Sequence, residues 1–514
     1  MKPLLWNLSA SELASKVASG ETSALEVIEN HLQRIELVNP EFNGIVNVLE
    51  DSALEAAKEV DRRRAAGETL GVLAGVPFTI KENIDVAGSA TTNGVPALRH
   101  AVATRDAPVV QRLRDAGAIP IGRTNLPDLS VRFHTRSQLY GDTVNPWDPT
   151  RTPGGSSGGE GAAVATGMSP LGLGNDAGGS IRIPALFGGV AALKPSYGRF
   201  PADRSVGPRD LPLCSQLIPV DGVIARTVAD LRIAFHTLAG PDPCDPRVAP
   251  VPVEGPQLPR PIRVAVARDP GRLGVHADVL RGIEIAAAAL CDAGYVLEEI
   301  DVPKLAETRE TYGRMIMTEF DLIQPMLQRL LSPDSRRYIE LSMALSGPVE
   351  LAEYIRLTSV RQGLLREWAQ FLSHHSLILG PVFTEPAPPV DFDIRGLHEL
   401  KQVGDALRLC TTTSFIGVPA VAVPTHVAGG LPQGVQVIAG SYREDLCLEA
   451  AAAIEARIGT FTPINPVPQR GLMMPRQRHE ERGASASEFP HLGHELLSRD
   501  AEVAVEKSPC DAQR

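Results

Sequence analysis

The sequence predicts an α/β fold with a largely buried sheet, and three observations support this prediction. Segments with apolar residues at helical spacing begin at capping-box patterns. Short uninterrupted apolar runs bounded by glycine or proline are typical of buried strands. The two kinds of segment alternate along the chain, as they do when helices cover a sheet.

The first elements are predicted to be helices. Ser9–Glu12 and Ser23–Glu26 both have the serine and glutamate of a capping box. After the second box, apolar residues recur at helical spacing and Pro40 is expected to end the helix. A third helix is predicted over residues 52–66, because Gly67 follows it.

Strands and helices then alternate. The run 75–81 predicts a short buried strand, 108–116 a helix and 118–122 another strand. A proline-rich stretch over residues 241–261 has little pattern and is expected to cross the surface between two halves. The elements expected after it are a strand at 263–267, helices to about residue 370, strands at 376–383, 417–424 and 434–440, and a helix at 443–458.

The chain has 514 residues, a length that by itself suggests about two to four domains. Its final stretch, residues 466–514, lacks apolar periodicity, so we predict a folded part over residues 1–465 and a disordered tail over 466–514. The start has no long apolar core, and no window approaches the ~18 apolar residues of a membrane span. These features predict a cytoplasmic protein that does not bind membranes.

Charge and cysteine usage exclude several classes of function. The formal net charge is −11 and no long run of Lys and Arg occurs, which argues against nucleic acid as a partner. The six cysteines are scattered without a Cys-x-x-Cys, and the twelve histidines form no His-Glu-x-x-His. We therefore expect reduced thiols and no metal site.

One stretch is unusually rich in glycine. Residues 154–180 contain ten glycines, where about two would be average. A flexible linker is disfavoured, because the glycines alternate with apolar runs that are typically buried. A nucleotide-binding loop is disfavoured as well, because the spacing Gly172-x-Gly174-x-x-x-Gly178 is one residue longer than the dinucleotide-binding fingerprint.

Two serine sites remain in this stretch. Residues 154–158 match the G-x-S-x-G nucleophile elbow at Ser156, but the three prolines in residues 143–153 make the strand that an elbow needs improbable. Ser180 follows two glycines, which let successive backbone N–H groups point the same way. With Ser180 as nucleophile, the N–H groups of Ala177, Gly178, Gly179 and Ser180 would form an oxyanion hole.

A serine nucleophile also needs a base. Lys81 stands at the end of the predicted buried strand, and burial disfavours the ammonium form. A neutral Lys81 would accept the proton of Ser180 through the hydroxyl of Ser156.

These residues together resemble the amidase signature family. The resemblance rests on VPFTIKENID (76–85), GRTNLPD (122–128), the glycine-rich motifs at 145–163 and 173–198, and the late motifs at 415–424 and 430–440. The resemblance extends from about residue 8 to 466. Over this range the sequence is similar to bacterial amidases and to the fatty acid amide hydrolase and indoleacetamide hydrolase branches of the family. The two serines stand 24 residues apart, as in the family.

The resemblance implies a fold, a reaction and a site. The fold would be a single α/β/α domain with a central mixed sheet of about eleven strands, here an amidase domain over residues 1–465. The site would be a Ser-cisSer-Lys triad of Ser180 as nucleophile, Ser156 as the bridging serine after a cis peptide bond, and Lys81 as base. Such enzymes hydrolyse linear amide bonds through an acyl-enzyme without metal or cofactor, and many are homodimers. Asp176 and Arg182 are expected to pair and hold the loop.

The substrate and the class of function stay open. The segment 129–141 would line the acyl channel, where Leu129 and Phe133 suggest an aryl or apolar acyl group, and His134 or Arg132 would meet a polar end or face solvent. An arylacetamide such as indole-3-acetamide is one hypothesis. The alternative is the amidase component of a glutamine-dependent tRNA amidotransferase, but residues 310–330 lack the glutamine-binding motif of that component. The intact Lys81, Ser156 and Ser180 argue against a non-catalytic binding protein.

Overall fold

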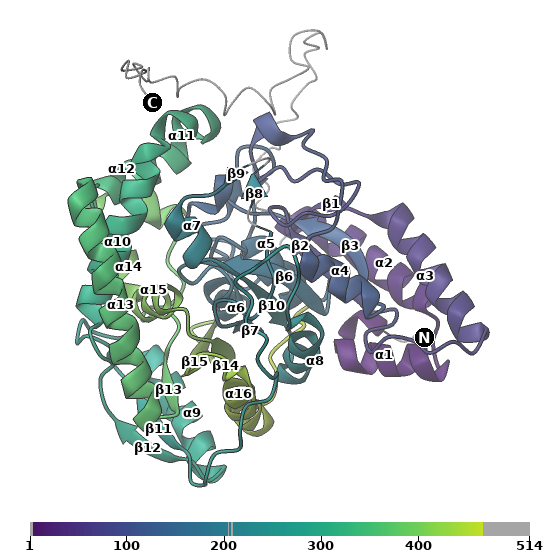
Figure 1. Ribbon diagram of the computed structural model, residues 1–514. Helices are drawn as coiled ribbons and strands as arrows, with labels where there is room; N and C mark the ends of the chain where they lie inside the picture. Colours follow the sequence, from purple (N-terminus) through teal and green to yellow (C-terminus); the bar gives the residue numbers. More distant parts are fainter. Residues whose placement is uncertain (1–3, 204, 207–208, 466–514) are drawn as a thin grey trace, which may run out of the picture. The chain divides into compact units, whose positions relative to one another are not determined.

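A computed structural model describes residues 4–203, 205–206 and 209–465. Its centre is an eleven-stranded mixed sheet with the order β1-β3-β2-β6-β10-β7-β14-β15-β13-β11-β12 (Figure 1). The strands of the sheet are β1 (Ile45–Val48), β2 (Pro77–Lys81), β3 (Ile119–Thr124), β6 (Leu171–Asp176), β7 (Ala191–Lys194), β10 (Val220–Ala225), β11 (Arg263–Val266), β12 (Val296–Glu299), β13 (Leu377–Pro381), β14 (Ala420–Ala428) and β15 (Leu431–Ala439).

The strand pairing is parallel in two places and antiparallel elsewhere. β2 runs parallel to both β3 and β6, and β11 runs parallel to β12 and β13. β14 and β15, which were predicted to pair, form a long antiparallel hairpin. The parallel pairing of β2 with β6 brings Lys81 and Asp176 to the same end of neighbouring strands. Two small hairpins lie outside the sheet: β4 (Arg136–Ser137) with β5 (Gly141–Asp142), and β8 (Ser205–Val206) with β9 (Arg209–Asp210).

Sixteen α-helices lie among the described residues. They are α1 (Ala10–Ser19), α2 (Ala24–Phe42), α3 (Glu50–Ala65), α4 (Pro108–Asp115), α5 (Gly158–Ala165), α6 (Arg182–Gly188), α7 (Leu213–Leu217), α8 (Val228–Leu238), α9 (Ala277–Asp292), α10 (Leu305–Leu322), α11 (Gln324–Leu330), α12 (Pro333–Leu345), α13 (Leu351–His374), α14 (Leu397–Ala406), α15 (Arg408–Ile416) and α16 (Glu444–Ile458). Both predicted capping boxes are present, at Ser9 with Glu12 and at Ser23 with Glu26.

Both faces of the sheet are covered, as alternating side chains of one strand show. Val223 belongs to the core cluster that includes residues of α8 and α16, whereas the next residue, Ile224, belongs to the cluster that includes α6. Successive side chains of a strand point to opposite faces, so these two clusters lie on the two sides of the sheet. The architecture is therefore the predicted α/β/α arrangement around a mixed sheet.

Several local predictions need correction. α2 continues past Pro40 to Phe42, because a proline in the last turn removes little of the helix's hydrogen bonding and Asn43, in a left-handed conformation, caps the end. The glycine-rich stretch contains the strand β6, β7 follows it, and the segment expected to be helical up to residue 370 also contains β12. The tail prediction concerns residues 466–514, which lie outside the described residues.

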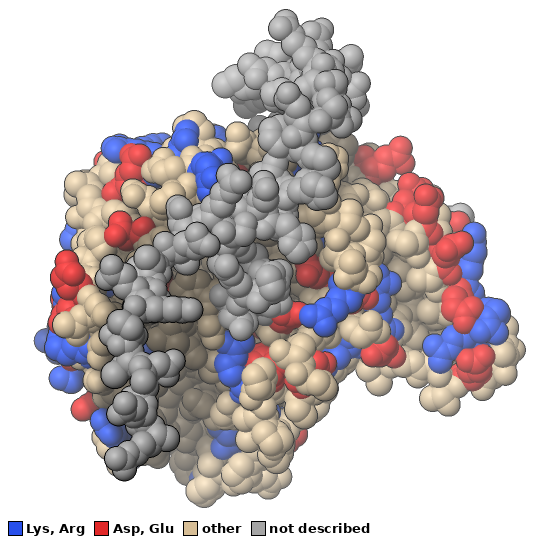
Figure 2. All heavy atoms as spheres, turned by 45° about the horizontal axis from the view of Figure 1, so that its top comes forward, with Lys and Arg blue, Asp and Glu red and all other residues tan. Residues whose placement is uncertain are grey.

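The surface carries both signs of charge. On the face shown in Figure 2, acidic and basic side chains are interspersed. At the end of α3, Arg62 pairs with Glu59 and Arg63 with Glu68, so this short arginine run belongs to a solvated helix end. Among the described residues, no helix is both long enough and apolar enough to cross a membrane.

Candidate active site

The structure brings Lys81, Ser156 and Ser180 to one cavity. Lys81 ends β2, Ser156 precedes α5, and Ser180 lies in the turn between β6 and α6. Ser156 and Ser180 line a cavity of about 1600 Å³, and the Nζ of Lys81 lies directly behind Ser156. The backbone N–H of Ser157 donates to the carbonyl of Ser180 at 3.1 Å, which holds the two serine loops together.

Lys81 is fully buried and makes two short polar contacts. Its Nζ donates to Ser156 Oγ at 2.6 Å and to Asn175 Oδ1 at 2.7 Å. Burial lowers the pKa of Lys81 to about 7, and the charges of Asp176, Asp221 and Glu160 only partly oppose this shift. A substantial fraction of the amine is therefore neutral near neutral pH, which is the form that can accept a proton.

Glycines permit the close packing around Ser156. The Gly155–Ser156 peptide bond is cis, as the family resemblance implies. A Cβ on Gly155 would lie 2.5 Å from the carbonyl oxygen of Phe133, so a larger residue could not fit there. The backbone of the segment that carries Phe133 therefore lies directly against the serine loop.

The four N–H groups of the predicted oxyanion hole differ in their present hydrogen bonding, and the hole itself stays a prediction. The N–H of Gly179 donates to Asp176 Oδ1 at 2.7 Å and is already engaged. Among the described residues, the N–H groups of Ala177, Gly178 and Ser180 have no such partner. Gly179 has φ +127°, a conformation that favours glycine, and it shapes the turn.

Asp176 and Arg182 pair as predicted. Arg182 Nε donates to Asp176 Oδ2 at 3.0 Å, and both side chains are fully buried. Burial by itself would raise the pKa of Asp176, but Arg182 outweighs it and holds that pKa well below its usual range. Arg182 also donates to Thr413 and Gln436, so it ties the serine loop to α15 and β15.

Glu160 lies behind Lys81 and is also fully buried. Thr79 and Thr124 donate to its two carboxylate oxygens at 2.6 and 2.7 Å. Burial raises the pKa of Glu160 to about 8 despite these hydrogen bonds. A carboxyl group that is largely protonated at neutral pH adds little negative charge near Lys81.

The predicted substrate-binding residues divide into two groups. Leu129 and Phe133 line the cavity. His134 does not: it is buried, with Nδ1 2.9 Å from Thr152 Oγ1 and Nε2 3.2 Å from Asp142 Oδ1. The chain bends at residues 133 and 134, so that only Phe133 turns toward the cavity.

Arg132 also lines the cavity but does not face solvent, since it is only 2% exposed; among the described residues, its Nη1 has no hydrogen-bond partner. Its buried guanidinium donates to Asp393 Oδ1 at 2.7 Å and to Asp391 Oδ1 at 3.0 Å. These ion pairs hold the cavity segment against the loop after β13. Some of the further apolar side chains of the cavity wall, which the sequence did not indicate, come from α10 and α12: Ile316, Met317, Phe320 and Tyr338.

The model of the Amidase family matches residues 26–448. The chain belongs to the amidase family. This amidase is 40% identical over 459 residues to an indoleacetamide hydrolase of Bradyrhizobium diazoefficiens, covering 89% of this chain and 88% of that protein. It is 32% identical over 494 residues to one subunit of the glutamyl-tRNA(Gln) amidotransferase of Salinispora tropica, covering 89% and 99%.

Solved structures agree with this assignment. A bacterial aryl acylamidase of the amidase signature family superimposes with a TM-score of 0.75 at 26% identity, covering 87% of this chain and 96% of that one. The 6-aminohexanoate cyclic dimer hydrolase in complex with its substrate gives a TM-score of 0.75 at 27% identity, covering 88% and 98%. This amidase is an enzyme that hydrolyses amide bonds.

Proposed function

We propose that this amidase hydrolyses a small carboxamide with an aryl or apolar acyl group through a serine acyl-enzyme. The observation that carries the proposal is the 2.6 Å contact between Lys81 Nζ and Ser156 Oγ at the wall of a cavity that Ser180 also lines. It joins a lysine whose pKa is lowered to about 7 to a hydroxyl beside the nucleophile. That combination is what general-base activation of a serine requires.

The proposed reaction begins with two proton transfers. The neutral amine of Lys81 takes the hydroxyl proton of Ser156, and Ser156 takes the proton of Ser180. Ser180 Oγ attacks the amide carbon, and the carbonyl oxygen becomes an oxyanion. The oxyanion accepts hydrogen bonds from the backbone N–H groups of Ala177, Gly178 and Ser180. As the C–N bond breaks, Ser156 gives one proton to the leaving nitrogen, and Lys81 returns its proton to Ser156. Water, activated in the same way, then releases the carboxylate.

Apolar side chains support the proposed acyl group. Leu129, Phe133 and the inward side of α10 present hydrocarbon and aromatic surface to the cavity. Phe133 is itself held by Phe383, stacked at a ring-centroid distance of 5.3 Å, and by Phe187 at 6.0 Å. An aryl group bound there would replace water against apolar surface, which is favourable. The name of the Bradyrhizobium relative makes indole-3-acetamide the first compound to test.

The first experiment identifies the nucleophile. Wild-type protein treated with a fluorophosphonate is expected to carry the adduct on Ser180, and Ser180→Ala should lose labelling and hydrolysis together. An adduct mapped to Ser156 or Ser157 would favour the nucleophile-elbow interpretation instead.

The second experiment identifies the substrate class. Purified protein is expected to release ammonia from indole-3-acetamide and phenylacetamide faster than from acetamide or glutamine, without ATP, tRNA or a partner protein. Hydrolysis of glutamine that depends on a partner protein would favour the amidotransferase component.

A further inference from the structure

A chain of three polar side chains extends from Lys81 to the cavity wall. Lys81 Nζ donates to Asn175 Oδ1 at 2.7 Å, and Asn175 Nδ2 donates to Asn83 Oδ1 at 2.9 Å. Asn83 Nδ2 in turn donates to Ser130 Oγ at 3.1 Å. Asn83, Ser130 and Asn175 all line the cavity beside Ser156. The chain therefore joins the lysine to the wall against which the substrate would pack.

The arrangement restrains the rotation of the lysine amine. A neutral amine has two N–H groups and one lone pair, and the lone pair must face Ser156 for proton transfer. Asn175 Oδ1 can only accept, so it engages an N–H of Lys81 and leaves the side toward Ser156 for the lone pair. Once Lys81 is protonated, the same oxygen accepts from the ammonium, so the acceptor is in place before and after the transfer.

Asn175 carries no charge, and this matters for the pKa of Lys81 as much as the geometry of Asn175 does. The acidic groups that face Lys81 come from three elements: Asp176 at the end of β6, Asp221 on β10 and Glu160 on α5. Asp176 and Asp221 raise the pKa of Lys81 and so oppose the effect of burial, whereas Glu160, being largely protonated at neutral pH, contributes little. An amide orients the amine without adding another negative charge.

We infer that Asn175 is a positioning residue for the proposed base: it fixes the Lys81 amine toward Ser156 while keeping the base neutral near neutral pH. This inference rests on the proposed function of Lys81. Asn83 supports it, because its carbonyl oxygen occupies the Asn175 Nδ2 group and keeps Asn175 Oδ1 turned toward the lysine.

The test compares two substitutions at the same position. Asn175→Asp retains the shape but places a carboxylate against Nζ, which is expected to raise the midpoint of the rising pH limb by about one to three units. Its rate at pH 7 should fall by about 10- to 1000-fold and recover in alkaline buffer. Asn175→Ala should lower kcat about tenfold or more, leave KM within about twofold, and not raise the midpoint. Gln111→Ala is the matched control, because Gln111 is another amide at the cavity whose Nε2 donates to Asp115 of its own helix.

Two measurements keep the outcome interpretable. The rate of fluorophosphonate labelling of Ser180 across pH needs no knowledge of the substrate, and thermal unfolding shows whether each variant folds. A folded Asn175→Asp protein with the wild-type midpoint would overturn the inference, and Asn83→Ala with wild-type kcat would overturn the supporting role of Asn83. If wild-type Ser180 is not labelled at all, the proposed function fails instead, so the two failures are distinguishable.

Discussion

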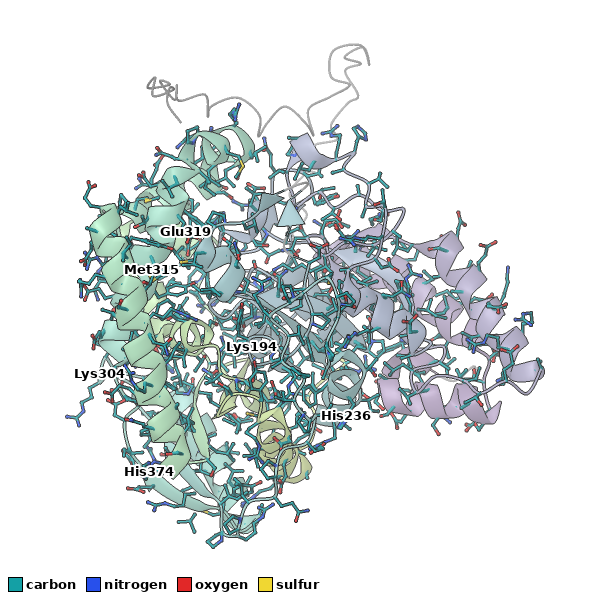
Figure 3. The ribbon with its side chains drawn as sticks, in the orientation of Figure 1. Lys194, His236, Lys304, Met315, Glu319 and His374 are labelled. Atoms are coloured by element: carbon teal, nitrogen blue, oxygen red, sulfur yellow. The ribbon has the colours of Figure 1, made fainter. Side chains whose placement is uncertain are left out.

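Lys81 and Lys194 occupy two regions of the same sheet that are alike in position, burial and pKa but differ in the group that contacts the amine. Each ends a strand, β2 or β7, each is fully buried, and burial lowers the pKa of each to about 7. Lys81, however, contacts the hydroxyl of Ser156 at the cavity, whereas Lys194 Nζ donates to the carbonyl of Pro195 at 3.0 Å. Lys194 lies among the central strands in Figure 3 and does not line the cavity.

The comparison shows that a lowered lysine pKa does not by itself mark a catalytic base. Desolvation acts on any ammonium in the core, and both sites provide it. What separates the two regions is the neighbour of the amine: a hydroxyl that can relay a proton in one region, and a carbonyl that can only accept in the other. A structural lysine and a chemical one can therefore share the same pKa.

The largest difference is expected in the reaction rate. Lys81→Met should lower kcat/KM for amide hydrolysis by roughly 10³-fold or more, because the serine loses its base. Lys194→Met should stay within about tenfold of wild type, since no reacting group contacts Lys194. Steady-state kinetics on both purified variants checks this, with circular dichroism to confirm folding. Equal losses in two well-folded variants would abolish the distinction between the regions.

The two lysine regions share one neighbour, Asp176, whose charge raises the pKa of both lysines. Asp176→Asn leaves the buried charge of Arg182 without its partner and should lower the free energy of unfolding by about 3–5 kcal/mol. Urea denaturation measures this. Glu59→Gln, which breaks an exposed ion pair on α3, serves as the control and should leave the denaturation midpoint unchanged.

The pH dependence of activity should follow one lysine alone. In the proposed mechanism the neutral form of Lys81 is the active one, so activity should rise about tenfold per pH unit below about pH 7 and level off above it. Lys194→Met should keep the wild-type midpoint. Lys81→Arg should not restore activity at any pH up to about 10, because a guanidinium stays protonated. If Lys194→Met shifted the midpoint of the pH–activity profile, the rise of activity with pH would have to be assigned to Lys194 and not to Lys81.

The pH dependence of stability should follow both lysines. An unfolded lysine keeps its proton up to about pH 10, whereas each folded lysine loses it above about pH 7. The unfolded state therefore binds more protons in this window, so stability should rise as the pH increases from about 7 to 10. Each Lys→Met variant should show a smaller rise in Tm than wild type over this range. Calorimetry at several pH values would reveal an unequal contribution.

The sequence predicted the lysine and the two serines because each stands in a local pattern: a strand end for Lys81 and glycine-rich turns for Ser156 and Ser180. Asn175 was missed, since its contact with Lys81 depends on the pairing of β2 with β6, in which Ile80 opposes Leu173. Lys194 was missed for the same reason, because its burial comes from the neighbouring strands. Local patterns indicate candidate groups, whereas the register between strands decides which of them meet.

The same limit explains the cavity wall. Phe133 and His134 are adjacent, and only the fold decides which of them faces inward. The residues of α10 lie far along the chain from the serines, and no local motif connects the two segments. The alternation of helices and strands was enough to predict the α/β class. The strands β7 and β12 were missed, because each has only four residues and so short an apolar segment cannot be told from part of a helix.

The hydrogen bond from the hydroxyl of Tyr312 to the carbonyl of Ala177, at 3.1 Å, joins two parts of the enzyme. The serines and their turn occupy one continuous stretch of chain, whereas α10 and α12 supply part of the cavity wall. Further hydrogen bonds, such as those of Ser332 and Ser335 to Asp128, also join the two parts. For protein engineering, the consequence is that recombining residues 305–374 between relatives, with Tyr312, Ser332 and Ser335 retained as joints, offers a route to new amide substrates.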